Sequence, residues 1–210
     1  MTDKTSPSKK DPGQKAGKPG CVIMAAGNSR RFGSNKLTAL INGKPLLSYA
    51  FDALPVEKLS HIVTVTRYEE AEALAASYGF CCIRNDHPEK GLSHTVRLGT
   101  QALCAQCDAI LYMVSDQPLL RRESVAGLID LYQKHPDHIV SAASGKKRGN
   151  PCIFPRKYFS LLLNLRGDTG GSAVIRDHRE ELLLFDIREE ELLDADTPEA
   201  FAQIRSFLLS

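Results

Sequence analysis

An apolar run that stops at a glycine constrains the fold of this chain more than any other feature. Residues 21–26 are all apolar and lead directly into Gly27. The short run and the glycine predict a buried strand that ends in a loop. The loop carries three cations and a second glycine: Arg30, Arg31, Lys36 and Gly33. Glycines let a backbone approach a ligand closely, and backbone N–H groups with cationic side chains bind phosphates. We therefore predict a site for a polyanion such as a nucleoside triphosphate.

The spacing in this loop excludes two common phosphate-binding motifs. A P-loop has four residues between its glycines and Lys-Ser or Lys-Thr directly after the second. Here five residues separate Gly27 from Gly33, and Ser34-Asn35 follow. The dinucleotide-binding pattern G-x-G-x-x-G is also absent. A turn that binds no ligand is the alternative, but it gives the neighbouring cations no role.

Length and charge favour one domain with a small-molecule ligand. The chain has 210 residues and a formal net charge of +2, which favours neither nucleic acid nor an anionic membrane. Residues 1–20 contain five lysines against two aspartates and almost nothing apolar, so we expect a disordered basic tail before a domain over residues 21–210. There is no secretory signal pattern and no run of 18 apolar residues. We expect a cytoplasmic protein.

The six cysteines do not indicate a disulfide scaffold in a chain of this length. Four of them lie in apolar, strand-like runs and are predicted to be small core residues: Cys21, Cys81, Cys82 and Cys152. The other two, Cys104 and Cys107, form a C-x-x-C pair without a second pair nearby. We expect both on a helix that faces the core, with a metal or redox site as the alternative.

Strand and helix patterns alternate from residue 21 onward. Strands are predicted over residues 21–26, 61–66, 80–84, 108–114, 139–143, 151–154 and 182–187. Helices are predicted over residues 45–54, 68–78, 93–107, 121–135, 156–165, 170–178 and 198–209. The alternation predicts an α/β fold, a mainly parallel sheet with helices on both faces. Ligands bind beyond the carboxyl ends of strands in such sheets, so the loops after 21–26 and 108–114 should share one crevice.

The second candidate site follows the predicted strand 108–114 and consists of Ser115-Asp116-Gln117-Pro118. An aspartate just past a core strand, with a proline two residues on, is well placed to hold Mg²⁺. This ion takes one or two protein carboxylates together with phosphate oxygens. The alternative is that Asp116 only caps the turn before the next helix.

The first loop resembles the L-A-A-G-x-S-x-R-x-G-x-x-K signature of nucleotidyltransferases with a glycosyltransferase-A-like fold. Seven residues match it: Ala25, Ala26, Gly27, Ser29, Arg31, Gly33 and Lys36. Met24 and Phe32 replace two other apolar residues. Together with the segments below, residues 21–201 resemble the molybdenum cofactor cytidylyltransferase family. The resemblance implies a single-domain, Rossmann-like fold of the nucleotide-diphospho-sugar transferase type.

The resemblance also implies the nucleotide site. The implied catalytic residues are Arg31, Lys36 and Asp116, with Asp116 binding Mg²⁺, for which Mn²⁺ can substitute. The implied nucleotide-binding residues are Ala25, Ala26, Gly27, Asn28, Ser29, Arg31, Gly33, Lys36, Ser93 and Asp116. Ser93 belongs to a segment similar to one that contacts the base and ribose, although His94 and Thr95 replace the usual serines. A helix cap is the alternative role for Ser93.

Later segments resemble the acceptor motifs of the molybdenum cofactor branch. Residues 148–151 are similar to its Gly-Asn/His-Pro segment, and residues 167–172 to its Gly-Asp-x-Gly-Ala-Arg motif. The implied acceptor-binding residues are Gln117, Pro118, Asn150, Asp168 and Gly170. Asp168 is also the implied second metal ligand, with a helix cap as the alternative. The chain has Gly171-Ser172 in place of Ala-Arg, and Arg176 is a candidate to replace the missing arginine.

One more segment, residues 194–198, matches the Asp-x-Asp-Thr-Pro of the family. Its Asp196 and Thr197 either cap the last helix or lie at the metal. The resemblance implies transfer of CMP from CTP to the terminal phosphate of molybdopterin, with release of pyrophosphate and a molybdenum hydroxylase as the recipient of the product. Neither nucleic acid nor a membrane is an expected partner.

Ala26 bears on the choice of nucleotide. Ala25-Ala26-Gly27 is similar to the cytidylyl-transferring type, whereas the guanylyl-transferring type has glycine at the middle position. The Ala26 methyl group narrows the base pocket and favours a pyrimidine. Two alternatives stay open. One is another NTP transferase, acting by guanylyl transfer or on a sugar or polyol phosphate. The other is a non-catalytic carrier of the molybdenum cofactor, which would need neither Lys36 nor Asp116.

Overall fold

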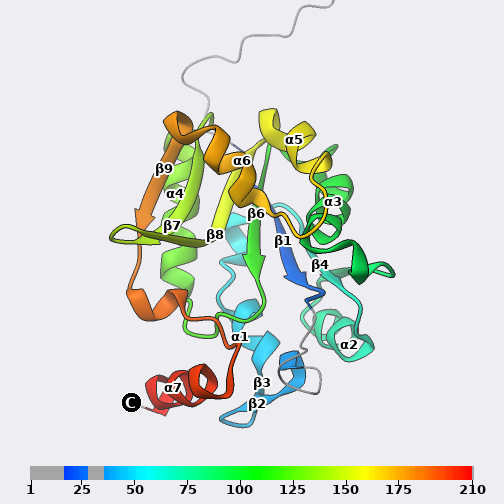
Figure 1. The fold of residues 1–210 in the computed structure, drawn as a ribbon, viewed down its shortest axis with the longest axis vertical. Helices are drawn as coiled ribbons and strands as arrows, with labels where there is room; N and C mark the ends of the chain where they lie inside the picture. Colours follow the sequence, from blue (N-terminus) through cyan, green and yellow to red (C-terminus); the bar gives the residue numbers. More distant parts are fainter. Residues whose placement is uncertain (1–16, 28–35, 210) are drawn as a thin grey trace, which may run out of the picture.

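Seven strands form one sheet in the order β5-β4-β1-β6-β8-β7-β9, with a separate small ribbon of β2 and β3 (Figure 1). The computed structural model describes residues 17–27 and 36–209. The strands are β1 (Gly20–Ala25), β2 (Leu40–Ile41), β3 (Lys44–Pro45), β4 (Ile62–Thr66), β5 (Cys81–Arg84), β6 (Ala109–Val114), β7 (Ile139–Ser144), β8 (Lys147–Pro155) and β9 (Leu182–Asp186). The α-helices are α1 (Leu46–Asp52), α2 (Glu69–Ser77), α3 (Leu92–Leu103), α4 (Arg122–Lys134), α5 (Phe159–Leu163), α6 (Gly171–Asp177) and α7 (Pro198–Leu209).

The predicted α/β fold is confirmed, and the apolar run at its start lies in the middle of the sheet. β1 pairs in parallel with both β4 and β6, and β4 with β5. β8 is antiparallel to β6 and to β7, whereas β7 and β9 are parallel. Because β1 is a central strand of a parallel sheet, both of its faces are covered, and this is why its sequence is continuously apolar.

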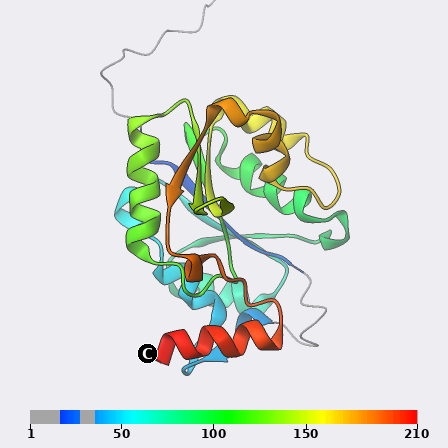
Figure 2. The same ribbon diagram turned by 60° about the vertical axis from the view of Figure 1, so that its left-hand side comes forward.

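Alternate residues of the central strands enter two separate cores. Cys21 and Ile23 of β1 join a cluster that contains Leu47 and Phe51 of α1 and Ile129 of α4. Val22, between them, points to the opposite face and joins a cluster with residues of α3, α5 and α6. Figure 2 shows α4 on one side of the sheet and α3, α5 and α6 on the other. The prediction of helices on both faces therefore holds.

The last helix closes the end of the molecule beside the small ribbon. Ile204 of α7 is buried in a third cluster with Ile41 of β2, Leu46 of α1 and Ala195. The hydroxyl Oγ1 of Thr197 accepts a hydrogen bond from the backbone N of Ala200 at 3.2 Å, so Thr197 caps α7 as one of the predicted alternatives. This packing brings the segment before α7 up to the loops at the carboxyl ends of β1 and β6.

The prediction that Cys81 and Cys82 are core residues is wrong. Both residues are exposed and form no disulfide. The reason is the position of β5 at the edge of the sheet, where it pairs only with β4. An edge strand can be apolar in sequence and still be exposed. The sequence of β5 does not show whether the strand lies at the edge or in the middle of the sheet. Cys21 and Cys152 are buried as expected.

The helix predicted over residues 93–107 ends earlier, at Leu103. Cys104 is therefore the residue that closes α3 and is half-buried, whereas Cys107 is buried beyond the helix. The Cys107 Sγ atom lies 3.4 Å from Ser60 Oγ and 3.7 Å from His61 Nδ1. The expectation that both cysteines lie on a helix that faces the core is thus wrong for the helix, although Cys107 does belong to the core. The described residues contain no group of three metal-ligating side chains.

Other differences are smaller. β8 is longer than predicted, and the helix predicted over 156–165 divides into a 3₁₀ turn, Arg156–Tyr158, and α5. Much of the predicted basic tail falls outside the described residues, and Gly20 already belongs to β1. In the described part of the chain, no helix has the length and apolar character needed to cross a membrane.

A buried carboxylate fastens the segment before α7 to the start of α4. Glu191 is fully buried, and its Oε1 accepts hydrogen bonds from Arg121 Nε at 3.2 Å and Nη2 at 3.1 Å. Its Oε2 accepts the backbone N–H of Arg121 at 3.0 Å. The backbone N of Arg188 donates to the same carboxylate.

Replacing this carboxylate should destabilise the protein. We expect Glu191→Ala to lower the free energy of unfolding by about 2–3 kcal/mol, because buried N–H donors lose a charged acceptor. The guanidinium itself is partly exposed, which keeps the loss below that of a fully buried ion pair. Urea unfolding measures the effect. Glu189→Ala is the control and should change stability by less than about 0.5 kcal/mol, since Glu189 is exposed. Equal stability of the two variants would contradict this role of Glu191.

Candidate functional site

The carboxyl ends of three neighbouring strands are held together by side-chain hydrogen bonds to the backbone of β1. Ser115 Oγ, just after β6, donates to the carbonyl oxygen of Met24 at 3.0 Å. Thr66 Oγ1 of β4 donates to that of Ala25, also at 3.0 Å. The Tyr68 hydroxyl donates to the carbonyl oxygen of Gly27 at 3.0 Å. The start of the predicted phosphate loop is therefore fixed where the sequence places the crevice.

Lys36 and Asp116 meet at this edge. Lys36 Nζ lies 2.7 Å from Asp116 Oδ2 and 2.5 Å from Asp196 Oδ1. The lysine side chain is 12% exposed, that of Asp116 20% and that of Asp196 53%. One ammonium thus lies between two carboxylates that come from distant parts of the chain.

The charges explain the ionisation of this cluster. Burial alone would lower the pKa of Lys36, but the charge and hydrogen bonds of Asp116 and Asp196 outweigh burial and raise that pKa above its ordinary value. Lys36 therefore stays protonated throughout the physiological range of pH. Its ammonium occupies a place where a cation is stabilised by two carboxylates.

Gln117, the residue after Asp116, joins two segments of the chain, and its predicted place at the acceptor stays a prediction. Gln117 is buried, and its Nε2 donates to Asp194 Oδ1 at 2.9 Å, while its Oε1 has no hydrogen-bond partner among the described residues. Burial, followed by the negative charge of Asp116, raises the pKa of Asp194. The backbone N of Ala195 donates to the carbonyl oxygen of Asp116 at 2.8 Å. Gln117 therefore joins the loop after β6 to the segment before α7.

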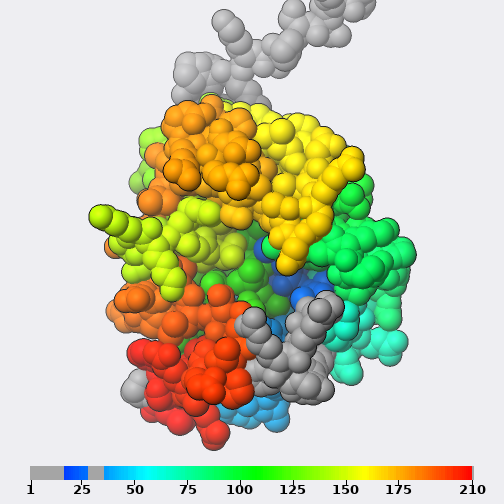
Figure 3. All heavy atoms as spheres, viewed as in Figure 1, coloured from blue at the N-terminus to red at the C-terminus, as the bar shows by residue number. Residues whose placement is uncertain are grey.

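A pocket of about 260 Å³ lies beside this cluster. Its walls come from β1, β6, β8, the start of α3 and the start of α6, and Val114 in its lining is two residues before Asp116. Figure 3 shows a hollow in the surface over β1 and β6, between α3 and the segment around α6. The lining residues are Met24, Leu92, Val96, Tyr112, Val114, Arg148, Gly149, Asn150, Cys152, Phe154, Leu162, Gly170, Gly171 and Ser172.

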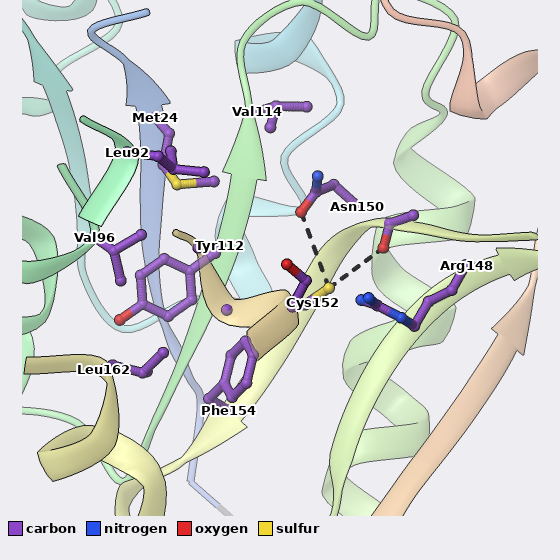
Figure 4. A pocket seen from close by; sticks show the side chains of 14 residues that line it. Met24, Leu92, Val96, Tyr112, Val114, Arg148, Asn150, Cys152, Phe154 and Leu162 are labelled. Atoms are coloured by element: carbon purple, nitrogen blue, oxygen red, sulfur yellow. Dashed lines mark hydrogen bonds between the residues drawn. The ribbon is translucent and has the colours of Figure 1, made fainter. Parts of the chain in front are cut away.

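Most of the pocket wall is apolar. Figure 4 shows the rings of Tyr112 and Phe154 together with Met24 and Leu162 around the space. The two rings meet edge to face, with centroids 5.8 Å apart. The Tyr112 hydroxyl lies 2.7 Å from Thr100 Oγ1, so this polar atom has a partner within the core. Arg148, Asn150 and Cys152 supply polar atoms on the β8 side.

The structure brings some of the predicted residues into this pocket and not others. Asn150 and Gly170 line it. Asp168 Oδ1 instead accepts the backbone N–H of Leu92 at 3.3 Å, at the start of α3, so its predicted place at the metal stays a prediction. Ser93 is buried, and its Oγ donates to the Lys90 carbonyl oxygen at 3.4 Å. The N-cap of α3 is Gly91 and not Ser93, for which a cap was the alternative prediction.

Several predictions concern residues outside the described part of the chain: Asn28, Ser29, Arg31 and Gly33. Pro118 follows Gln117 in the loop after β6, and no contact of it with the pocket lining is described. The idea that Arg176 replaces the missing arginine does not hold. Its side chain is 66% exposed and pairs with Asp177 at 3.3 Å, outside the pocket lining.

Sequence reasoning missed the polar side of the pocket. Arg148 belongs to the segment 148–151 that resembles an acceptor motif but was given no role of its own, and Cys152, just after this segment, was assigned only to the core. The signal was present in the Arg-Gly-Asn-Pro run, because an arginine beside a ligand segment is a common anion contact. Asp194 gave no such signal, since its contact with Gln117 joins residues 77 positions apart.

Comparison with known proteins defines the family. Residues 21–182 match the family described as the MobA-like NTP transferase domain. The chain belongs to this family. It is 28% identical over 196 residues to the purine catabolism protein PucB of Bacillus subtilis. The aligned region covers 88% of this chain and 94% of PucB. It is 32% identical over 117 residues to a probable molybdenum cofactor guanylyltransferase of Thermococcus kodakarensis, over 54% of this chain and 53% of that protein.

Solved structures show the same fold. A nucleotidyl transferase from Methanothermobacter superposes with a TM-score of 0.78 at 19% identity, covering 91% of this chain and 98% of the other. The Rv0371c protein of Mycobacterium tuberculosis, in a complex with manganese, has a TM-score of 0.73 at 20% identity, over 90% and 98% of the two chains. The chain is therefore a nucleotidyltransferase of the MobA-like type by family and by fold.

The departure at Gly171 has a steric reason. A Cβ atom at this position would lie 2.7 Å from Cζ of Phe154, whose ring is buried and packs on Tyr112 and Tyr158. The alanine that the family motif has here does not fit beside this phenylalanine.

Gly171→Ala should therefore disturb the pocket wall. We expect a loss of about 1–3 kcal/mol in the free energy of unfolding, because the Phe154 ring has to move out of a packed position. Ser172→Ala is the matched control, since Ser172 lines the same pocket and is exposed, and should change stability by less than about 0.5 kcal/mol. Urea unfolding of both variants decides, and an unchanged Gly171→Ala protein would contradict the steric explanation.

Proposed function

We propose that this protein transfers CMP from CTP to the terminal phosphate of molybdopterin and releases pyrophosphate. The observation that carries the proposal is the meeting of Lys36 and Asp116 beside a largely apolar pocket that contains Asn150 and Gly170. A charged cluster next to a pocket with aromatic walls suits a triphosphate on one side and a flat acceptor on the other. The relatives named molybdenum cofactor guanylyltransferase support an acceptor of this type.

In the proposed reaction, an oxygen of the acceptor phosphate attacks the α-phosphorus of CTP. The bond between that phosphorus and the oxygen bridging to the β-phosphate breaks, and pyrophosphate leaves with this oxygen and the bonding electrons. The product contains the new pyrophosphate linkage of molybdopterin cytosine dinucleotide. Such transfers depend mainly on positioning and charge neutralisation, so no covalent intermediate on the protein is required.

The side chains have distinct roles in this proposal. Lys36, together with Arg31 from outside the described residues, neutralises the triphosphate and the leaving pyrophosphate. The backbone of residues 25–27 and of the following loop, with Asn28, Ser29 and Gly33, holds the phosphates. Ser93 lies on the side of the base and ribose. Asn150, Asp168 and Gly170, with Gln117 and Pro118 of the loop after β6, position the acceptor.

The donor set fits a divalent cation. Asp116 and Asp196 both direct a carboxylate oxygen at one point, which the Lys36 ammonium occupies in this structure. Mg²⁺ uses one or two carboxylates and completes its shell with phosphate oxygens and water. We propose Asp116 and Asp196 as its protein ligands, with Asp168 as the further candidate, and the manganese complex of Rv0371c supports Mn²⁺ as a substitute. When bound, the ion supplies positive charge to the triphosphate oxygens.

Guanylyl transfer is the second candidate, favoured by the names of several relatives. A cytidylyltransferase acting on a polyol phosphate is supported by a relative named 2-C-methyl-D-erythritol 4-phosphate cytidylyltransferase, at 34% identity over about half of the chain. A non-catalytic carrier for a molybdenum hydroxylase is the remaining alternative. In the cytidylyltransferase proposal, a molybdenum hydroxylase is the protein that receives the dinucleotide product.

A nucleotide screen tests the choice. Purified protein is incubated with molybdopterin, Mg²⁺ and each of four NTPs, and pyrophosphate and the dinucleotide product are measured. We expect CTP to be preferred and Ala26→Gly to raise the GTP-to-CTP ratio of kcat/KM by about 10-fold or more, because the buried Ala26 methyl group narrows the base site. Preference for GTP in the unchanged protein would identify the guanylyl alternative. Molybdopterin binding without pyrophosphate release would identify a carrier.

Removing a charge of the cluster should abolish catalysis without unfolding the protein. We expect Lys36→Ala, Asp116→Ala and Arg31→Ala each to lower kcat by about 100-fold or more, because charge on the transferring phosphates is no longer neutralised. Lys58→Ala is the matched control, since it breaks an ion pair with Asp130 of similar length on the surface. Circular dichroism checks the fold. Full activity of Asp116→Ala would refute the proposed metal site.

A further inference from the structure

The pocket beside the charged cluster contains one guanidinium. Arg148 is the single lysine or arginine among the described residues that line it. The side chain is half-buried and has no carboxylate partner within the described part of the chain. Figure 4 shows its guanidinium directed toward Cys152 Sγ, on the β8 side of an otherwise largely apolar wall. A positive charge in largely apolar surroundings is costly unless an anion pairs with it.

A bulge in β8 aims this side chain. Ser141 of β7 pairs with Cys152 of β8, and Ala143 of β7 pairs with Arg148 of β8. The step from the first pair to the second is two residues along β7 but four residues along β8. Two additional residues of β8 are therefore accommodated between these pairs. Bulges re-aim side chains and occur next to functional sites. As a result Arg148, Asn150 and Cys152 all reach the same pocket.

The neighbouring thiol leaves the charge of Arg148 in place. Cys152 Sγ is buried and lies 3.1 Å from Ser141 Oγ and 3.3 Å from the Gly149 carbonyl oxygen. Burial raises the pKa of this thiol, so it is neutral at physiological pH. The remaining polar groups of the lining, Asn150 and Ser172, carry no charge either.

Two other cations of the described residues already have carboxylate partners. Lys36 lies between Asp116 and Asp196, and Arg176 pairs with Asp177 at the surface. Yet an acceptor phosphate that approaches a triphosphate meets strong like-charge repulsion, which a cation on the acceptor side has to reduce. The pocket wall supplies this cation at Arg148.

We propose that Arg148 binds the phosphate monoester of the acceptor and holds it for attack, taking the part of the arginine that Ser172 replaces. The inference rests on the function proposed above. A guanidinium suits this task because its planar N–H groups can bind two phosphate oxygens at once, which an ammonium cannot do in the same way.

The test compares two ligands on two proteins. Binding of molybdopterin and of molybdopterin from which a phosphatase has removed the phosphate is measured by titration calorimetry for the unchanged protein and for Arg148→Met. Methionine retains much of the apolar stem of the side chain. We expect removal of the phosphate to weaken binding about 10- to 100-fold in the unchanged protein, and by less than about 3-fold in the variant.

Kinetics give a second readout. We expect Arg148→Met to raise KM for molybdopterin at least 10-fold and to leave KM for CTP unchanged, and Arg148→Lys to restore part of the loss. Arg176→Met is the matched control and should behave like the unchanged protein. Thermal unfolding confirms that each variant is folded.

The outcomes separate the two proposals. If the unchanged protein forms the dinucleotide and Arg148→Met has the same acceptor affinity and KM as Arg176→Met, the role of Arg148 is refuted and the proposed function stands. If removal of the phosphate weakens binding equally in the unchanged protein and Arg148→Met, the guanidinium contacts another part of the acceptor, and the proposal is also refuted. If the unchanged protein forms no product with any NTP, the proposed function fails, and the role of Arg148 with it.

Discussion

The ammonium of Lys36 holds together the parts of this site that the chain delivers separately. It lies within hydrogen-bond distance of Asp116, 80 residues away, and of Asp196, 160 residues away. Without a cation between them the two carboxylates would repel each other, and the loop after β6 and the segment before α7 would lose a common anchor. Two further hydrogen bonds, from Gln117 to Asp194 and from Ala195 to Asp116, join the same two segments.

This arrangement divides the site into two halves of different chemistry. The half that contains Lys36, Asp116 and Asp196 is charged. The other half is a pocket with aromatic and aliphatic walls, and its polar groups lie on β8. Phe154 shapes this second half, because its ring occupies the space that any side chain at position 171 would need. A change of acceptor within the family would therefore require changes on β8 and at the start of α6 together.

Much of the fold could be predicted because it depends on local pattern. The continuous apolar run of β1 indicates a strand buried on both faces, and Pro198 indicates the start of α7, which lies where the sequence placed it. The loops containing Gly27 and Asp116 lie close together because they follow neighbouring parallel strands, whose carboxyl ends meet at one edge of the sheet.

What failed depends on long-range packing. Nothing in Cys81 and Cys82 shows that β5 is an edge strand, because the identity of the edge is set by which strands pair and not by their composition. The bulge that turns Arg148 into the pocket is equally invisible, since it arises from the pairing of β8 with β7. The hydrogen bond from Gln117 to Asp194 could not be foreseen either, because its two residues lie 77 positions apart in the chain.

The exposed sulfurs of β5 have a practical consequence. The strand is only four residues long and ends in Arg84, whose guanidinium pairs with Glu72 and Asp86, so charge discourages a second sheet from docking edge to edge. The two cysteines of the strand differ: the Cys82 thiol lies 3.9 Å from the Glu72 carbonyl oxygen and burial raises its pKa, whereas Cys81 is an exposed free cysteine. Oxidation requires an accessible sulfur, so Cys81 is the first candidate for coupling two molecules during purification, and a reductant in the storage buffer is the appropriate safeguard.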